Sequence, residues 1–201
     1  MTKDFVYLAS ASPRRSDLLR QIGVRFEVRP VAIAEEREPG ESPATYVTRL
    51  AVAKASAVWE QLEDPDTAPV LAADTAVVLD DRVLGKPASP AAAAQMLEQL
   101  SGRSHNVLTA VAVRHRQRSQ TLLSSSEVRF RATTQPERWA YCQTGEPLDK
   151  AGGYGIQGFA AVFVEHLSGS YSAVMGLPLF ETAVLLRSFG VPLWLDGGSA
   201  G

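Results

Sequence analysis

The sequence has little cysteine, no long apolar run and no pattern typical of a secretory signal in its first residues. Its 201 residues include a single cysteine, Cys142, so a disulfide within the chain is excluded and a reducing compartment is favoured; we expect this thiol to be structural. No segment reaches the roughly 20 apolar residues that a membrane span requires. The first residues also lack the basic start and long apolar stretch of a secretory signal. We therefore expect a cytoplasmic protein with no membrane partner.

Several familiar binding patterns are also missing. The net charge is −2 at pH 7 and the pI is near 5.9, which argues against binding a nucleic acid polymer through a basic face. There is no GxxxxGK[ST] phosphate loop, and no GxGxxG motif follows a predicted strand. His105, His115 and His166 lack the spacing of zinc ligands, and we expect each to be structural. Any phosphate chemistry must therefore depend on a local cluster of cations.

The apolar pattern alternates between strand and helix periods along the chain. With 45% hydrophobic and 21% charged residues, the composition fits one globular domain or two small lobes. The pattern predicts strands at 6–9, 25–30, 70–79, 83–84, 106–115, 122–131 and 160–167, helices at 14–22, 42–62, 90–100, 135–144 and 179–189, and a loop at 169–176. The helix predicted at 42–62 has Tyr46, Leu50, Ala53 and Ala57 on one face. This order favours an α/β fold with a mixed sheet. The small residues at 197–201 are expected to form a flexible tail.

The segment Ser10 to Arg15 has the features of a phosphate site. It joins a predicted strand to a predicted helix, with Ser12 at the N-cap position and Pro13 at the first helical position. The free backbone N–H groups and the positive end of the helix dipole would then face an anion. Arg14 and Arg15 add planar donor forks that match phosphate oxygens. The alternative is an ordinary capped helix whose arginines lie in solvent.

Asp74 is an ionisable residue inside an otherwise apolar strand. The residues at 70–73 and 76–79 are all apolar. A buried carboxylate left without a partner costs several kcal/mol. We therefore expect Asp74 to be neutralised by a cation, to bind a metal, or to be held protonated. The alternative is a structural aspartate that caps a turn or pairs with a core arginine.

Other polar residues complete a candidate polyphosphate pocket. Lys86 lies between a glycine and a proline, and Lys54 lies beside the apolar helix face, although either lysine could simply be solvated. Glu35 opens an acidic loop whose simpler interpretation is a surface charge run. Gln157 lies in a glycine-rich segment at 152–158, and its amide could recognise a base edge that carries both a donor and an acceptor. Together these groups suggest cations for phosphates, carboxylates for a divalent ion, and an aspartate that orients or deprotonates water.

Six short motifs carry a family resemblance. They are Leu8-Ala9-Ser10-Ala11-Ser12-Pro13-Arg14-Arg15, Ala73-Asp74-Thr75, Gly85-Lys86-Pro87, Leu100-Ser101-Gly102-Arg103 with His105 and Thr109, Gly145-Glu146-Pro147-Leu148-Asp149-Lys150-Ala151-Gly152, and Gly169-Ser170-Tyr171 with Gly176-Leu177-Pro178. In this order and spacing, from about Val6 to Phe189, the chain closely resembles the Maf family of nucleoside triphosphate pyrophosphatases. The resemblance implies a single Maf-like domain over 1–196 with the fold of inosine triphosphate pyrophosphatases, in which two lobes share an elongated mixed sheet and enclose a cleft.

The same resemblance implies an activity. Family members hydrolyse a nucleoside triphosphate between the α- and β-phosphates with Mg²⁺ or Mn²⁺, giving a monophosphate and pyrophosphate. The segment at 154–158 is similar to the branch that acts on dTTP and UTP. The alternatives are a pyrophosphatase for 7-methyl-GTP or modified pyrimidine nucleotides, and a non-catalytic nucleotide-binding regulator of cell division. Family analogy also implies a homodimer.

Residue roles can be carried over from the resemblance. Asp74 matches the catalytic carboxylate, and Glu35 matches an acidic position near the metal, which we expect Asp74 to share. The positions that match or adjoin the phosphate-binding residues are Ser10, Ser12, Arg14, Arg15, Lys54 and Lys86. Arg14, Thr75 and Gln157 match positions associated with the choice of base. Gly153 departs from the branch, which often has alanine there.

Overall fold

The computed structural model describes residues 4–63 and 68–194, which divide into two compact units. The first unit comprises 4–63, 68–74, 109–124 and 176–194, and the second comprises 75–108 and 125–175. The predicted tail at 197–201 lies outside the described residues. Among the described helices, none is long and apolar enough to cross a membrane.

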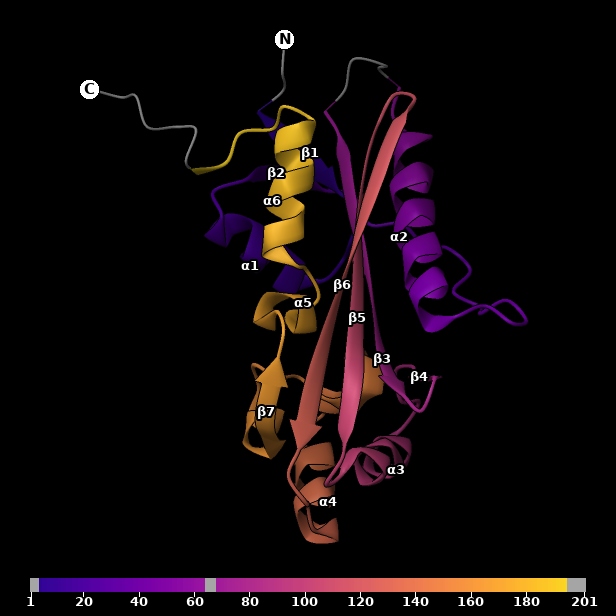
Figure 1. Ribbon diagram of the computed structural model, residues 1–201, viewed down its shortest axis with the longest axis vertical. Coiled ribbons are helices and arrows are strands. Elements are labelled where there is room, and N and C mark those ends of the chain that lie inside the picture. The colour runs from indigo at the N-terminus through magenta and orange to yellow at the C-terminus, as the bar shows by residue number, and fades with distance from the viewer. Residues whose placement is uncertain (1–3, 64–67, 195–201) are drawn as a thin grey trace. The chain divides into compact units, whose positions relative to one another are not determined.

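The sheet is mixed, as the sequence predicts. Its strand order is β2-β1-β3-β5-β6-β7, with β4 paired to β3. The strands are β1 (Phe5–Leu8), β2 (Arg25–Val28), β3 (Val70–Leu79), β4 (Arg82–Leu84), β5 (Ser104–His115), β6 (Arg118–Phe130) and β7 (Val164–Ser168). β1 pairs in parallel with β2 and β3, whereas β3–β4 and β6–β7 are antiparallel. These pairings confirm the predicted α/β class (Figure 1).

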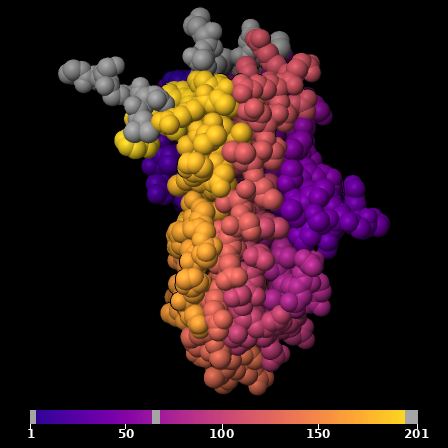
Figure 2. All heavy atoms as spheres, viewed as in Figure 1, coloured from indigo at the N-terminus to yellow at the C-terminus, as the bar shows by residue number. Residues whose placement is uncertain are grey.

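The first unit packs helices against the parallel strands. Its helices are α1 (Pro13–Gln21), α2 (Pro43–Trp59) and α6 (Leu179–Ser188). Its core is formed by leucines from these strands and helices that are almost fully buried, namely Leu8, Leu19, Leu50, Leu71 and Leu186. On the face drawn in Figure 2, the surface of this unit runs from α6 in yellow across the tip of the β5–β6 hairpin to α2 in purple. The hairpin tip is tied to α6 because Arg118 donates to the Ser188 carbonyl and stacks over the ring of Phe189.

The second unit has an aromatic core. Its helices are α3 (Pro90–Leu100), α4 (Gln135–Gln143) and α5 (Tyr171–Met175), with short 3-10 turns at Glu146–Asp149, Ala151–Gly153 and Phe159–Phe163. Phe130 of β6 is fully buried, and the rings of His105, Tyr154 and Phe163 pack against it. The His105 and Tyr154 rings meet Phe130 edge to face, a geometry that adds to the stability gained from burial alone.

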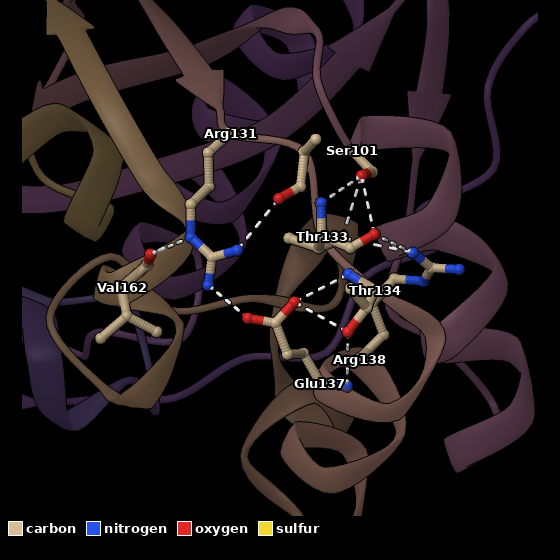
Figure 3. A network of polar contacts seen from close by, with 8 residues as sticks. Ser101, Arg131, Thr133, Thr134, Glu137, Arg138 and Val162 are labelled. Atoms are coloured by element: carbon tan, nitrogen blue, oxygen red, sulfur yellow. Dashed lines mark hydrogen bonds and ion pairs between the residues drawn. The ribbon is translucent and has the colours of Figure 1, made fainter.

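A polar network fixes the start of α4 (Figure 3). Thr134 and Glu137 form a reciprocal capping box, and Glu137 also accepts from Arg131 at 2.7 Å. Arg138 is buried, and its guanidinium donates to the Thr133 carbonyl at 2.7 Å. The same guanidinium pairs with Glu98 of α3 at 2.9 Å. These contacts hold α3 and α4 together in the second unit.

The structure corrects several local predictions. The strand predicted at 160–167 is a 3-10 turn followed by β7, and the loop predicted at 169–176 contains α5. The buried face of α2 is also different from the predicted one and consists of Val47, Leu50, Ala51, Ala55 and Val58, whereas Tyr46, Ala53 and Ala57 are only half-buried. The prediction followed one apolar stripe, and alanine-rich helices leave that stripe ambiguous because alanine suits either face.

Candidate active site

Ser10 organises the turn between β1 and α1. Its hydroxyl accepts from the Ser12 backbone N–H at 3.2 Å and from Arg15 Nη1 at 3.1 Å. Ser12 occupies the N-cap position and Pro13 the first helical position, as predicted, but the Ser12 side chain makes no capping hydrogen bond. The turn thus leads directly into the N-terminus of α1, where the positive end of the helix dipole favours an anion.

Arg15 is held in place by two groups of the first unit. Besides Ser10, its Nε donates to the Gly176 carbonyl at 2.8 Å. Burial lowers the pKa of Arg15, the negative charge of Asp74 opposes this, and Arg14 lowers it further. Arginine stays protonated in proteins under such shifts. The turn therefore carries a fixed positive charge within electrostatic reach of Asp74.

Asp74 and Glu35 converge on Lys54. The Lys54 ammonium on α2 lies 2.7 Å from Asp74 Oδ1 on β3 and 2.6 Å from Glu35 Oε1 in the loop before α2. The side chains of Lys54 and Asp74 are 12% and 10% exposed, whereas that of Glu35 is 50% exposed. The buried aspartate thus has a cationic partner, and one side of the cluster is open to solvent.

The electrostatics of this cluster suit a proton acceptor. Burial raises the pKa of the Asp74 carboxyl above its ordinary value, while Lys54 and then Arg15 lower it and Glu35 raises it. The net shift is upward, which brings a carboxylate closer to the basicity that proton abstraction near neutral pH requires. Asp74 therefore combines burial, a charge partner and a perturbed pKa, which together are typical of functional carboxylates.

Sequence reasoning missed the residues that hold the acidic loop on α2. The Tyr46 hydroxyl donates to the Glu35 carbonyl at 2.8 Å. Arg49 binds the buried Glu41 carboxylate in a two-pronged contact, with both distances 2.7 Å, and donates to the Glu36 carbonyl at 3.0 Å. Tyr46, Arg49 and Lys54 project from neighbouring turns of α2. The sequence signal for this support was a tyrosine and an arginine, spaced three residues apart in a helix that follows an acidic loop.

The donor set fits a divalent cation that binds together with a phosphorylated ligand. Within residues 4–63 and 68–194, no three His, Cys, Asp or Glu side chains are arranged to hold a metal ion. Two carboxylate oxygens, from Glu35 and Asp74, nevertheless converge on one positive charge at 2.6 and 2.7 Å. Mg²⁺ is commonly held by one or two carboxylates, and substrate phosphates and water complete its shell.

The remaining predicted residues lie elsewhere. Arg14 is a half-buried residue in the first turn of α1. Thr75 follows Asp74 in β3, and adjacent strand residues point to opposite faces. Lys86, in the loop after β4, and Gln157, in the glycine-rich segment at 152–158, are exposed residues of the second unit. The structure therefore brings Ser10, Arg15, Glu35, Lys54 and Asp74 together, and the roles of the other residues stay predictions.

Comparison with known proteins gives consistent matches. The model of the Maf-like protein family matches residues 5–189. A dTTP/UTP pyrophosphatase of Saccharophagus degradans is 53% identical over 190 residues, which cover 94% of this chain and 90% of that protein. A dTTP/UTP pyrophosphatase of Pasteurella multocida is 48% identical over 200 residues, covering 96% and 100%. A solved structure of the Ham1 protein of Staphylococcus aureus aligns with 92% of this chain and 96% of its own at 12% identity, with a TM-score of 0.48. On the match to the family model and the two dTTP/UTP pyrophosphatase relatives, the chain belongs to the Maf family.

Proposed function

We propose that the protein hydrolyses dTTP and UTP to the corresponding monophosphate and pyrophosphate. The observation that carries the proposal is the cluster of Asp74, Lys54 and Glu35 in the unit that also contains the α1 N-terminus. It provides a buried base next to cations that suit a triphosphate. The relatives described above, named dTTP/UTP pyrophosphatases, point to the same activity and substrates.

The triphosphate binds to the positive groups of the first unit. Backbone N–H groups at the start of α1 and the guanidinium groups of Arg14 and Arg15 are matched to phosphate oxygens. The hydroxyls of Ser10 and Ser12 lie in the same turn. Because pyrophosphate leaves with high negative charge, these fixed donors stabilise charge that grows on the bridging oxygen as the bond breaks.

Asp74 acts as the base in the chemical step. A water oxygen forms a bond to the α-phosphorus while the bond to the α–β bridging oxygen breaks, and pyrophosphate departs with that electron pair. The proton of the water passes to the Asp74 carboxylate. Lys54 holds that carboxylate through its contact with Oδ1 and fixes its orientation toward the water.

Glu35 and Asp74 would hold the divalent cation, Mg²⁺ or Mn²⁺, on which Maf-family pyrophosphatases generally depend. When bound, the cation would neutralise phosphate charge and lower the pKa of a bound water. Tyr46 and Arg49 support this arrangement because they fix the backbone on which Glu35 is carried.

Base selection and assembly complete the proposal. Gln157 presents an amide that can both donate to and accept from the O4 and N3–H edge of uracil or thymine, and Lys86 assists with the phosphates. Arg14 and Thr75 contribute to the choice of base, and the protein works as a homodimer. These assignments rest on the family resemblance and on the exposure of Lys86 and Gln157.

The experiment is a panel of nucleoside triphosphates assayed for pyrophosphate release with Mg²⁺ and with Mn²⁺. The expected result is turnover of dTTP and UTP well above that of dCTP, dATP and dGTP. Stoichiometric binding of dTTP without product would contradict the enzymatic proposal. Preferential turnover of 7-methyl-GTP would contradict the proposed substrate.

A further inference from the structure

Gln157 lies at the tip of a tight turn in the second unit. The Gly158 N–H donates to the Gly155 carbonyl at 3.0 Å and closes the turn, with Ile156 and Gln157 between them. Ile156 is 8% exposed and packs in the aromatic core, whereas Gln157 is exposed. The turn therefore has one buried anchor and one side chain presented to solvent.

The carboxylate of Glu146 lies directly against both ends of this turn. Its Oε2 accepts from the Phe159 backbone N–H at 2.9 Å, and its Oε1 accepts from the Tyr141 hydroxyl at 3.0 Å. Burial and then the Glu146 contact raise the pKa of Tyr141, so this phenol stays protonated and donates. Hydrogen bonds to an ionised carboxylate are roughly twice as strong as neutral ones.

Glu146 is itself locked in position. Its backbone N–H donates to Thr144 Oγ1 at 3.2 Å, and its carbonyl accepts from Lys150 Nζ at 2.7 Å. At the start of the same segment, the Tyr154 hydroxyl lies 2.8 Å from His105 Nε2 in the buried core. The turn is thus held on the Tyr154 side by the core and on the Phe159 side by a fixed carboxylate.

The glycines of the turn make room for that carboxylate. A Cβ at Gly158 would overlap the Glu146 carboxylate, and a Cβ at Gly155 would lie 2.7 Å from Lys150 Cε and 3.2 Å from Glu146 Oε1. Gly158 has φ −106° and ψ −152°, an extended conformation that is open to other residues. Glycine is therefore required at 158 by the close approach of Glu146 and not by its backbone angles.

We propose that Glu146 is a positioning residue for substrate specificity, because it holds the 155–158 turn in the place where Gln157 contacts the base. This inference rests on the proposed function, because it takes Gln157 as the group that contacts the pyrimidine. Cytosine presents its donor and acceptor in the reverse order to thymine, so discrimination depends on where the Gln157 amide is held. A turn released from Glu146 would lose that discrimination.

The first test measures the contact independently of activity. Melting temperatures are compared for the wild type, Glu146→Ala, Gly158→Ala and the double variant. Glu146→Ala deletes the carboxylate, and Gly158→Ala displaces it, so each single change is expected to lower the melting temperature by about 2–4 °C. In the Glu146→Ala background, Gly158→Ala should cause no further fall. Gly85→Ala is the matched control, because a Cβ there meets nothing within 4 Å, and it should not lower the melting temperature. Additive losses in the double variant would overturn the proposal.

The second test measures specificity as the ratio of kcat/KM for dTTP to that for dCTP. Glu146→Ala and Gly158→Ala should each lower this ratio about tenfold, the effect of losing roughly one hydrogen bond to the base. Glu146→Gln should restore it, since its amide oxygen can accept from the Phe159 N–H and its NH₂ can donate to Tyr141. In a Gln157→Ala background, Glu146→Ala should change the ratio no further.

The outcomes separate this inference from the proposed function. A ratio that falls in Gln157→Ala but stays at the wild-type value in Glu146→Ala would overturn the role of Glu146 and leave the proposed function intact. Equal turnover of dTTP and dCTP by the wild type would overturn the proposed substrate preference, and the inference with it.

Discussion

Replacing Asp74 by asparagine separates catalysis from stability at the proposed base. The amide keeps the volume of the side chain, and its oxygen can still accept from Lys54, whose Nζ lies 2.7 Å from Oδ1 in the wild type. The change removes the proton-accepting carboxylate, and general-base catalysis contributes roughly 10²–10⁴ in rate. We therefore expect kcat for pyrophosphate release from dTTP to fall by at least about 10².

The same substitution should not destabilise the fold. Because the pKa of Asp74 is raised by burial, its ionised form is held less well in the folded protein than in the unfolded chain. Its contribution to stability is therefore present below its unfolded pKa and is lost as the pH rises through the folded pKa. At neutral pH, removing the charge should leave the melting temperature unchanged or higher, while Lys54 keeps its contact with Glu35 at 2.6 Å.

The assay pairs steady-state pyrophosphate release with thermal denaturation of the same samples. Asp80→Asn is the matched control, because it makes the same chemical change at an exposed carboxylate that pairs with Arg103 at the β3–β4 turn. It should leave both readings near the wild type. An Asp74→Asn enzyme within tenfold of wild-type kcat would refute the assignment of the base, and a large drop in melting temperature would refute the electrostatic argument.

Three further substitutions test the surroundings of the site. Lys54→Met leaves the buried Asp74 unpaired and should lower the free energy of unfolding at neutral pH by about 3–5 kcal/mol, measured by urea denaturation; an unchanged midpoint would contradict the pairing. Arg49→Met releases Glu41 and the acidic loop and should raise KM for dTTP more than it lowers kcat; an unaltered KM would show that the loop needs no such support. Burial lowers the pKa of His105 to about 4 from 6.5, so the unfolded chain gains a proton first as the pH falls, and stability should drop by about 3 kcal/mol between these values. The His105→Gln variant should not show this loss of stability. Identical profiles of stability against pH for the variant and the wild type would contradict the prediction.

The sequence predicted well the features that depend on local pattern. The turn from β1 to α1 was expected because hydrophobic strand residues give way to serine and proline at the start of a helix. The strand that contains Asp74, β3, was predicted with its observed bounds, 70–79. Asp74 was expected to need a partner, since burial of a lone carboxylate is costly. The sequence around Asp74 did not show which residue that partner is.

Features that depend on distant pairings were not predictable in the same way. Lys54 meets Asp74 across 20 residues of sequence, and Arg15 meets the Gly176 carbonyl across 161. The Ser12 side chain was expected to cap α1, but it makes no such bond, while the nearby Ser10 hydroxyl accepts from Arg15. The role of Glu146 depends on a turn at 155–158 that approaches only in the folded unit.

The most direct test of the central claim is hydrolysis of dTTP in ¹⁸O-labelled water, with the position of the label determined by mass spectrometry. Attack of water at the α-phosphorus, with Asp74 as the base, predicts one ¹⁸O atom in dTMP and none in pyrophosphate. Label in pyrophosphate, or release of inorganic phosphate instead, would contradict the account.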